Sequence, residues 1–537
     1  MQGFFERSGF ARRFGIPRRG IPTQAGRDAW PKGPLILATA ALVLAAPLHA
    51  ATAPSTLLFV DDHDVLYRSG TKRVFHPAKR FAGNPVIAQD KPWELTISYN
   101  SVYRDPATGK YQLWYQALSA KSPELASVCY AESMDGVKWI KPELGLFSFD
   151  GQKTNMVLDG EKGHYGASVL VDPRDPDPER RYKMAFYRVA EVEGRETMGL
   201  AVAFSPDGIH WKVHPKVPLL TGSYGKRLDP PFADEVLEDR GIPLSVSDVI
   251  DVMYDEPRGV YAIYSKTWLD TPDGKSIWKR GVVRTESKDF VNWSTPQLVI
   301  QPDEFDGTGI EYRPPIGKVH PNRRGVQLHG GPVFFANDVY FSLLQKMDGE
   351  TTGEMPCELA ISRNGLDWNR PFRKEDFIPV DADKDKFDGG CLWTNSTPVY
   401  LEDEIRFYYG GYSGLWNGDL FRSPSGIGFA SIRKDRFAGI RPMEDIGQVT
   451  LKARDLSGVE EILLNANAEQ GTVKVEILTD GGFRVKGFTK DDAVALTGDK
   501  RDLKAAWKDA KLSDLPSGKY WIRIHLDQAE VFACTLR

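Results

Sequence analysis

The chain has 537 residues, of which 41% are hydrophobic and 26% are charged, and its formal net charge is −4. This length allows more than one domain, and the composition is ordinary for a globular protein. The small negative charge gives no reason to expect a nucleic acid or an anionic membrane surface as a partner. Four cysteines occur, none in a Cys-x-x-Cys pair, so no zinc site is predicted.

An export signal is predicted over residues 1–53. Residues 1–32 are basic, residues 35–46 are uncharged and rich in Leu and Ala, and Pro47 and small residues follow. This order is typical of a secretory signal, and the apolar run is short for a membrane span. We therefore expect a periplasmic or extracellular protein that has no membrane association after cleavage; a membrane anchor is the alternative. Export would also allow one disulfide, although the sequence does not say which.

A short Ser-x-Asp/Asn motif followed by Trp recurs roughly every 75 residues. Asp and Gly favour a tight turn, and the Trp supplies a large side chain that can pack between neighbouring units. This pattern predicts a β-propeller. The four copies are Ser133-Asp135-Gly136-Trp139, Ser205-Asp207-Gly208-Trp211, Ser287-Asp289-Trp293 and Ser362-Asn364-Gly365-Trp368.

A second repeat, of acidic or amide turn residues followed by an aromatic strand, predicts five blades over residues 54–440. The fifth blade lacks the Trp motif, and its outer strand is expected at residues 428–433. The five turns are Asp105-Pro106, Asp172-Pro173, Asp255-Glu256-Pro257, Asn337-Asp338 and Glu402-Asp403.

Residues 447–537 have a different pattern. Val473, Val475 and Ile477 alternate with polar residues, and so do the apolar residues of 520–526. This period of two is typical of half-buried antiparallel strands, and it predicts a small β-sandwich. The predicted fold class is therefore all-β: a five-bladed β-propeller followed by a small β-sandwich, whose expected role is packing and whose alternative role is carbohydrate binding.

Candidate site residues follow from the propeller architecture, because the first strand of each blade lines the central channel. Each predicted first strand carries an ionisable residue near the same position, and unpaired buried charges usually serve a ligand. Three are carboxylates, predicted as catalytic: Glu94, Asp248 and Asp388. Two are imidazoles, predicted to bind substrate hydroxyls: His164 and His329. Asp251 is the alternative to Asp248, because strand alternation lets only one of them face the channel.

Paired carboxylates beside aromatic residues fit the hydrolysis of glycosidic bonds, which needs a proton donor and a base or nucleophile. Trp93, Trp393, Trp416 and Tyr412 are expected beside the channel mouth, where they could stack on sugar rings. Glu311 and Arg313 lie in a long loop between blades three and four and are further candidates for substrate binding. No cofactor and no metal site are predicted; the oxygen ligands present could hold a channel Ca²⁺, but no feature demands one.

The repeat region resembles the five-bladed β-propeller glycoside hydrolases grouped around families 32, 43, 62, 68 and 117, with residues 130–146 as its clearest stretch. It is most similar to exported bacterial proteins described as family 32 N-terminal domain-like, in which a β-sandwich often follows the propeller. Motifs depart from the family 32 enzymes: Trp93-Glu94 has no matching Asp motif, Arg104-Asp105-Pro106 lies in a hairpin turn, and Cys357-Glu358 reverses the order of the acid motif. Fructan or sucrose hydrolysis is therefore not implied.

The function predicted from these observations is an exported glycoside hydrolase that acts on an oligo- or polysaccharide, as a monomer. Two alternatives remain: a non-catalytic glycan-binding propeller, and a glycoside phosphorylase with phosphate-binding Arg or Lys at the mouth. The sequence does not specify the sugar, the linkage, exo or endo action, or the stereochemical outcome.

Overall fold

A computed structural model describes residues 54–537 apart from 123–124, 161–162, 193, 221–243, 245, 271–276, 307–324, 417 and 419. The export signal predicted over residues 1–53 lies outside this range. No helix within the described residues is long and apolar enough to cross a membrane.

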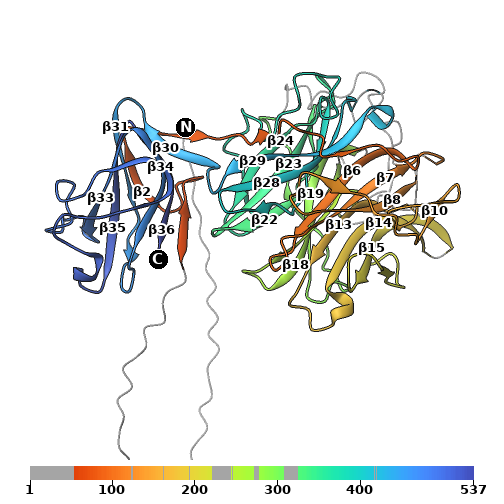
Figure 1. The fold of residues 1–537 in the computed structure, drawn as a ribbon, viewed down its shortest axis with the longest axis horizontal. Coiled ribbons are helices and arrows are strands. Elements are labelled where there is room, and N and C mark those ends of the chain that lie inside the picture. The colour runs from red at the N-terminus through yellow and green to blue at the C-terminus, as the bar shows by residue number, and fades with distance from the viewer. Residues whose placement is uncertain are drawn as a thin grey trace, which may run out of the picture. The chain divides into compact units, whose positions relative to one another are not determined.

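Five antiparallel sheets confirm the predicted five-bladed propeller (Figure 1). Blade one contains β6 (Glu94–Arg104), β7 (Tyr111–Ser119), β8 (Ala126–Ser133), β9 (Trp139–Ile140) and β12 (Met156–Leu158), with a small hairpin of β10 (Ser148–Phe149) and β11 (Gln152–Lys153). Blade two contains β13 (Tyr165–Val171), β14 (Tyr182–Val192), β15 (Arg195–Ser205) and β16 (Lys212–Val213). Blade three contains β17 (Ile250–Asp255), β18 (Val260–Asp270), β19 (Ile277–Ser287) and β20 (Gln297–Ile300).

In blade four, β21 (Val326–Gly330) and β22 (Val333–Ala336) pair with β23 (Val339–Asp348), followed by β24 (Cys357–Ser362) and β25 (Trp368–Asn369). In blade five, β26 (Cys391–Trp393) and β27 (Val399–Tyr400) pair with β28 (Glu404–Tyr412), followed by β29 (Ser425–Arg433). The outer strands of blade five come from earlier in the chain, because β4 (Lys79–Arg80) and β5 (Ile87–Ala88) pair with β29. The expectation that residues 428–433 form this outer strand was therefore wrong, and the N-terminal strands close the ring.

The repeated Trp motif links neighbouring blades. In the first copy, Ser133 Oγ accepts a hydrogen bond from the Gly136 amide at 2.9 Å, and Asp135 accepts two further backbone amides. In the three copies that contain a glycine, its carbonyl accepts from an aromatic side chain of the preceding blade. These donors are Tyr408 to Gly136, Trp114 to Gly208 and Tyr264 to Gly365. The motif therefore joins neighbouring blades through these hydrogen bonds, and we call this contact the clamp between blades.

Residues 394–397, between β26 and β27 of blade five, form hydrogen bonds to residues of three other blades. Thr394 Oγ1 donates to the Leu343 carbonyl of blade four at 2.7 Å, and Asn395 Nδ2 donates to Asn100 of blade one at 2.8 Å. Ser396 Oγ donates to the Val252 carbonyl of blade three at 2.8 Å. This one segment therefore links blade five to three other blades.

The C-terminal module is a ten-stranded antiparallel assembly. It contains β30 (Ala438–Pro442), β31 (Ile446–Leu451), β32 (Arg454–Asp455), β33 (Ile462–Thr479), β34 (Leu496–Lys504), β35 (Lys519–Asp527) and β36 (Glu530–Leu536). The predicted alternation is confirmed, because Val473, Val475 and Ile477 enter one apolar core with residues of β35.

Three strands of this module come from the other end of the described chain. They are β1 (Ser55–Leu58), β2 (Val65–Ser69) and β3 (Thr71–Phe75), which pair with β36, β31 and β30. Residues 54–75 were expected in the propeller, and strand pairing places β1–β3 in the C-terminal module instead.

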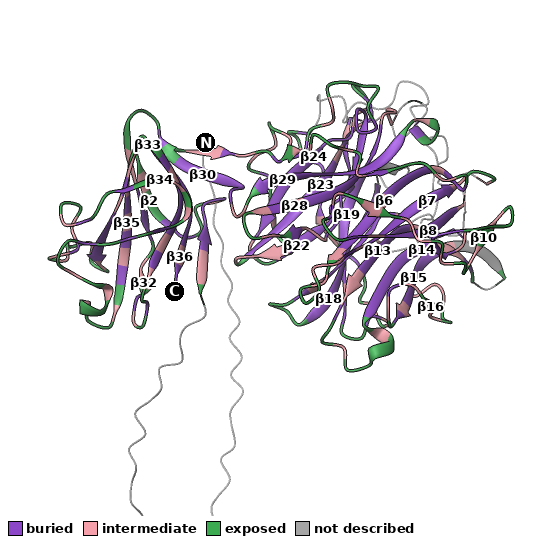
Figure 2. Ribbon diagram, in the orientation of Figure 1, coloured by how far each residue is buried: buried purple, intermediate pink, exposed green. Residues whose placement is uncertain are grey.

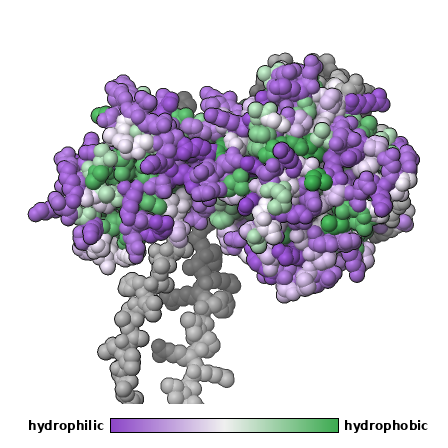
Figure 3. Space-filling view, viewed as in Figure 1, coloured by the Kyte–Doolittle hydropathy of each residue, from purple (hydrophilic) through white to green (hydrophobic). Residues whose placement is uncertain are grey.

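Burial follows the strand pattern in both parts: the long blade strands are largely buried, and the turns between them are exposed (Figure 2). The face shown in Figure 3 is mostly hydrophilic, with small hydrophobic areas. All four cysteines are buried free thiols.

Candidate active site

A cavity of about 480 Å³ lies where the inner strands of the five blades converge. Every blade contributes to its lining, which identifies it as the central funnel of the propeller. The lining residues are Ser98, Tyr99, Gln116 and Leu118 of blade one, Tyr165 of blade two, Asp248 of blade three, His329 of blade four, and Trp393, Tyr412, Trp416 and Phe421 of blade five.

Asp248 is the one carboxylate among the described residues that line this cavity. Its side chain is 35% exposed, and it forms an ion pair with Lys266 of β18, whose side chain is only 3% exposed. Ser247 Oγ also donates to Asp248 Oδ1 at 3.0 Å. Burial alone would raise the pKa of Asp248, but the Lys266 charge and hydrogen bond, with a smaller effect of His329, lower it to about 2. Asp248 is therefore ionised in the funnel at neutral pH.

His329 of β21, in the neighbouring blade four, is a buried imidazole that also lines the cavity. Its Nδ1 is 3.0 Å from Gln345 Oε1. Burial, and then the charges of Lys266 and Arg280, lower the pKa of His329 well below its ordinary value. The funnel thus contains an anionic carboxylate and a neutral imidazole.

Aromatic rings form the remaining wall. Trp393 packs edge-on against Tyr412 with ring centroids 4.6 Å apart, and the His329 and Trp416 centroids are also 4.6 Å apart. The backbone amide of Trp416 donates to the Gly353 carbonyl at 2.7 Å, which anchors the β28–β29 loop to blade four. Trp393, Trp416 and Tyr412 therefore lie at the funnel, as predicted.

Tyr99 is a lining residue that sequence reasoning missed. It comes from β6 and packs edge-on against Trp393 with ring centroids 6.0 Å apart. Burial raises the pKa of Tyr99, and the nearby Asp248 and Asp251 carboxyls raise it further. Lys266 was missed as well, because the sequence argument considered only the first strand of each blade and Lys266 lies in the second strand of blade three, β18.

Asp251 is 5% exposed and does not line the funnel. Of the two alternative channel residues predicted in blade three, Asp248 is therefore the one at the cavity. Its carboxyl has no hydrogen-bond or ion-pair partner among the residues that the structure describes. Burial raises the pKa of Asp251 well above its ordinary value.

The structure does not bring Glu94 to the funnel. Its fully buried carboxylate accepts from Tyr115 Oη at 2.7 Å, from Lys141 Nζ at 2.8 Å, and from the amides of Asp90 and Lys91. The register of β6 and β7 shifts twice, between Glu94 and Thr96 and between Ser98 and Asn100. These irregularities disturb the simple alternation, and Ser98 and Tyr99 lie at the cavity instead. This geometry gives no support to the predicted catalytic role of Glu94.

Asp388 is also away from the funnel lining. Its carboxylate accepts from Tyr409 Oη at 2.7 Å and lies 4.0 Å from Arg80, which comes from closing strand β4. Burial raises the pKa of Asp388, and the Tyr409 and Arg80 contacts oppose that shift. The carboxylate therefore belongs to the closure of blade five, and its predicted catalytic role likewise has no geometric support.

Two other predicted binding residues lie in the packing between strands. Trp93 donates from Nε1 to Asn155 at 3.1 Å within the blade-one core. His164 packs against Phe186 with ring centroids 5.0 Å apart, and burial followed by the Arg188 charge lowers its pKa to about 4. Glu311 and Arg313 lie outside the described residues.

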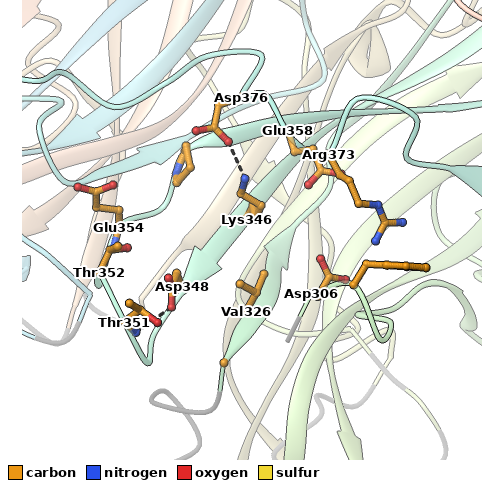
Figure 4. Close-up of a pocket in the computed structure, with 13 residues that line it drawn as sticks. Asp306, Val326, Lys346, Asp348, Thr351, Thr352, Glu354, Glu358, Arg373 and Asp376 are labelled. Carbon is orange, nitrogen blue, oxygen red and sulfur yellow. Dashed lines mark hydrogen bonds and ion pairs between the residues drawn. The ribbon is translucent and has the colours of Figure 1, made fainter. Parts of the chain in front are cut away.

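A second pocket, of about 360 Å³, lies at blade four beside β23 and β24 (Figure 4). Four of its five described carboxylates are paired with cations: Asp376 contacts Lys346 at 2.6 Å, Glu354 contacts Lys384 at 2.7 Å, and Glu358 and Asp306 share the buried guanidinium of Arg370. Asp348 is the remaining carboxylate and accepts from the Thr351 amide at 2.9 Å, so the described lining of this pocket holds no free pair of carboxylates. Within the described ranges, no group of His, Cys, Asp and Glu side chains could hold a metal ion.

No family model and no curated protein matches this chain. Among solved structures, a putative glycoside hydrolase from Bacteroides ovatus is 15% identical, with a TM-score of 0.40, covering 66% of this chain and 97% of that chain. A structure titled as a study of β-1,2-mannoside-targeting hydrolases in the GH130 family of mannoside phosphorylases is 16% identical, with a TM-score of 0.41, covering 66% and 94%. The Bombyx mori GH32 β-fructofuranosidase is 10% identical, with a TM-score of 0.40, covering 86% and 94%. At these scores we transfer neither an activity nor a residue role.

Proposed function

We propose that the protein is an exported glycoside hydrolase whose reaction centre is the central funnel of the propeller. The observation that carries this proposal is the ionised carboxylate of Asp248 in a cavity walled by Trp393, Trp416 and Tyr412. Aromatic faces and edges suit the apolar faces of sugar rings, and a carboxylate suits the cationic character of a glycosidic transition state. Asp248 is assigned as the base or nucleophile because its pKa is low.

Hydrolysis also needs a proton donor at the leaving oxygen. Asp251 has the raised pKa that such a donor requires, but it is not among the residues that line the funnel. Glu311, a substrate-binding candidate from the sequence that lies outside the described residues, is the second candidate. We assign the donor to one of these two residues, and substitution of each distinguishes them.

Glycan binding without cleavage is the second candidate function. It is favoured by the single carboxylate found among the described lining residues, because binding needs no carboxylate pair. Phosphorolysis has weaker support, because it needs an Arg or Lys side chain that binds phosphate. Lys266 is already paired with Asp248, and Arg280 donates to Gln327 at 2.9 Å.

The test is release of reducing sugar from arabinan, xylan, mannan, levan and galactan by the purified protein, with and without inorganic phosphate. Asp248→Asn should lower cleavage by about 10²–10⁴-fold, the usual effect of removing an acid–base group. Asp376→Asn, in the second pocket, is the matched control and should keep activity. Loss of cleavage in Asp251→Asn or in Glu311→Gln then identifies the proton donor.

Binding of a glycan with no cleavage would replace this proposal by the binding function. Cleavage that requires phosphate would replace it by phosphorolysis. Full activity of a folded Asp248→Asn variant would remove Asp248 from the reaction.

A further inference from the structure

A chain of polar groups lies directly behind the funnel wall. His329 Nδ1 is 3.0 Å from Gln345 Oε1. Gln345 Nε2 in turn lies 3.4 Å from the Thr394 carbonyl and 3.5 Å from its hydroxyl. The Thr394 hydroxyl donates to the Leu343 carbonyl at 2.7 Å. His329, Gln345 and Thr394 are all at least nine-tenths buried.

The direction of these hydrogen bonds is fixed by chemistry. A backbone carbonyl can only accept, and the Thr394 hydroxyl proton is already used on Leu343. The amide nitrogen of Gln345 must therefore face Thr394, so its oxygen faces His329 and accepts. It follows that Nδ1 of His329 carries the proton. In a neutral ring, the lone pair is then on Nε2.

Nε2 is the ring nitrogen left for the funnel. His329 lines the cavity, and Nε2 has no hydrogen-bond partner among the residues that the structure describes. The ring is held between Trp393 and Trp416, with centroids 6.0 and 4.6 Å away. Lys266 and Arg280 disfavour a second proton on this ring. An acceptor nitrogen of fixed orientation is therefore presented to whatever occupies the funnel.

We propose that His329 Nε2 accepts a hydrogen bond from a hydroxyl group of the bound sugar, and that Gln345 is the positioning residue that fixes the required tautomer. The proposal rests on the proposed function only in taking the ligand to be a carbohydrate. A site built to accept from a hydroxyl group rejects ligands that lack it, because the buried acceptor would then be unpaired. His329 and Gln345 together would thus determine sugar specificity.

The backbone beside His329 is consistent with this role. A Cβ atom added at Gly330 would lie 2.8 Å from Gln345 Oε1 and 2.7 Å from Val249 Cγ1. A larger residue at position 330 would therefore displace either blade three or the amide that orients the imidazole. Gly330 is needed for Gln345 to reach His329.

The first measurement needs no ligand: long-range ¹H–¹⁵N spectra of the full chain labelled with ¹⁵N-histidine, with His329→Asn to assign the signal. We expect an Nδ1–H tautomer that does not titrate between pH 5 and 8. Gln345→Glu should stabilise the imidazolium and make His329 titrate in that range, while Gln345→Met should lose the tautomer preference. An Nε2–H tautomer, or a cationic ring in the unsubstituted protein at pH 7, would overturn the assignment of Gln345.

The second measurement is binding of soluble disaccharides (xylobiose, arabinobiose, mannobiose, galactobiose and sucrose) by calorimetry. Gln345→Met should weaken binding of the recognised disaccharide by about tenfold, the loss expected for one hydrogen bond to a buried acceptor. Gln112→Met should not weaken binding; it removes a glutamine of blade one that contacts Tyr130 of blade one and Tyr182 of blade two.

The two measurements separate the two proposals. If the tautomer is as expected and Gln345→Met binds as tightly as the unsubstituted protein, the ligand role of His329 is wrong. If no disaccharide binds and no glycan is cleaved, the proposed function fails together with the ligand role, while the spectra still decide whether Gln345 fixes the tautomer.

Discussion

Asp248 and Asp251 lie three positions apart in blade three, and their environments shift their pKa values in opposite directions. Lys266 supplies a cation to Asp248, whereas Asp251 is buried without a charged partner. Divergent pKa values within one site are how enzymes obtain an acid and a base from the same side-chain type. The sequence could not reveal this difference, because Lys266 comes from the next strand.

Replacing Lys266 with Met should move the acidic limb of the pH–activity profile to higher pH. The Lys266 charge holds the pKa of Asp248 at about 2, so its loss raises that pKa and leaves more of the carboxyl protonated under mildly acidic conditions. The pKa of His329 should rise as well, which acts in the same direction. The measurement is kcat/KM against pH.

Lys346→Met is the control, because Lys346 pairs with Asp376 in the second pocket at 2.6 Å. An unshifted acidic limb in Lys266→Met would mean that Asp248 ionisation does not limit the reaction.

Asp251→Asn should stabilise the protein at pH 7 and not at pH 3.5. The folded-state pKa of Asp251 is raised, so the folded protein keeps a proton that the unfolded chain releases above about pH 4. Native stability is therefore lost as pH rises from about 4 toward the folded-state pKa, and the neutral amide avoids this loss. Urea unfolding at the two pH values measures it; an equal difference at both would contradict the raised pKa.

Glu94→Gln should destabilise the protein by about 3–5 kcal/mol, the usual cost of breaking a buried ion pair, because Lys141 would keep a buried charge. Activity per folded molecule should stay unchanged if Glu94 is structural. Glu132→Gln is the matched control, since its pair with Lys110 is partly exposed and should contribute at most about 1 kcal/mol. Loss of activity in a folded Glu94→Gln variant would restore the catalytic prediction.

Among the structural elements, the turns of the repeated Trp motif could be predicted well from sequence because their chemistry is local. Ser, Asp and Gly satisfy their own backbone groups within four residues. Funnel residues near the inner strands were predicted in part: Asp248, His329 and Trp393 lie at the cavity. Glu94 was misassigned because the β6 register shifts and Lys141 arrives from a segment 47 residues away, and neither has a local signal.

Gly208→Ala tests the clamp between blades one and two. Gly208 has a φ of +79°, and an added Cβ would lie 2.5 Å from Trp114 Cζ2. The substitution should cost about 1–2 kcal/mol for the left-handed backbone and about 1–3 kcal/mol more for displacing the indole. Gly259→Ala is the control, since it has a φ of +65° and open space around it. The free energy of unfolding is measured with urea. Equal destabilisation in the Gly208→Ala and Gly259→Ala variants would show that the contact with Trp114 is unimportant.

For the whole molecule, strand pairing across long sequence separations escaped prediction. Alternation identified the strands of residues 447–537, but nothing in residues 54–75 indicates that β1 pairs with β36. Leu57, Phe59 and Val65 are buried in the core of the C-terminal module, where each contributes about 1.5–3 kcal/mol.

A fragment of residues 438–537 should therefore fail to unfold cooperatively, and adding a peptide of residues 54–76 should restore a cooperative transition. Circular dichroism during thermal unfolding measures both. A cooperative transition in the fragment alone would show that β1–β3 are dispensable.

The pairing of β1 with β36 also bears on the order in which the protein can be completed during synthesis. The strands β1–β3 leave the ribosome before any blade, yet their partners β30, β31 and β36 follow all five blades. Their edges must stay unpaired while the propeller is made, which exposes them to wrong partners and to proteases. A nascent chain stalled before residue 530 could close neither β1 nor β33 against β36, so quality control could recognise incomplete chains by these open edges.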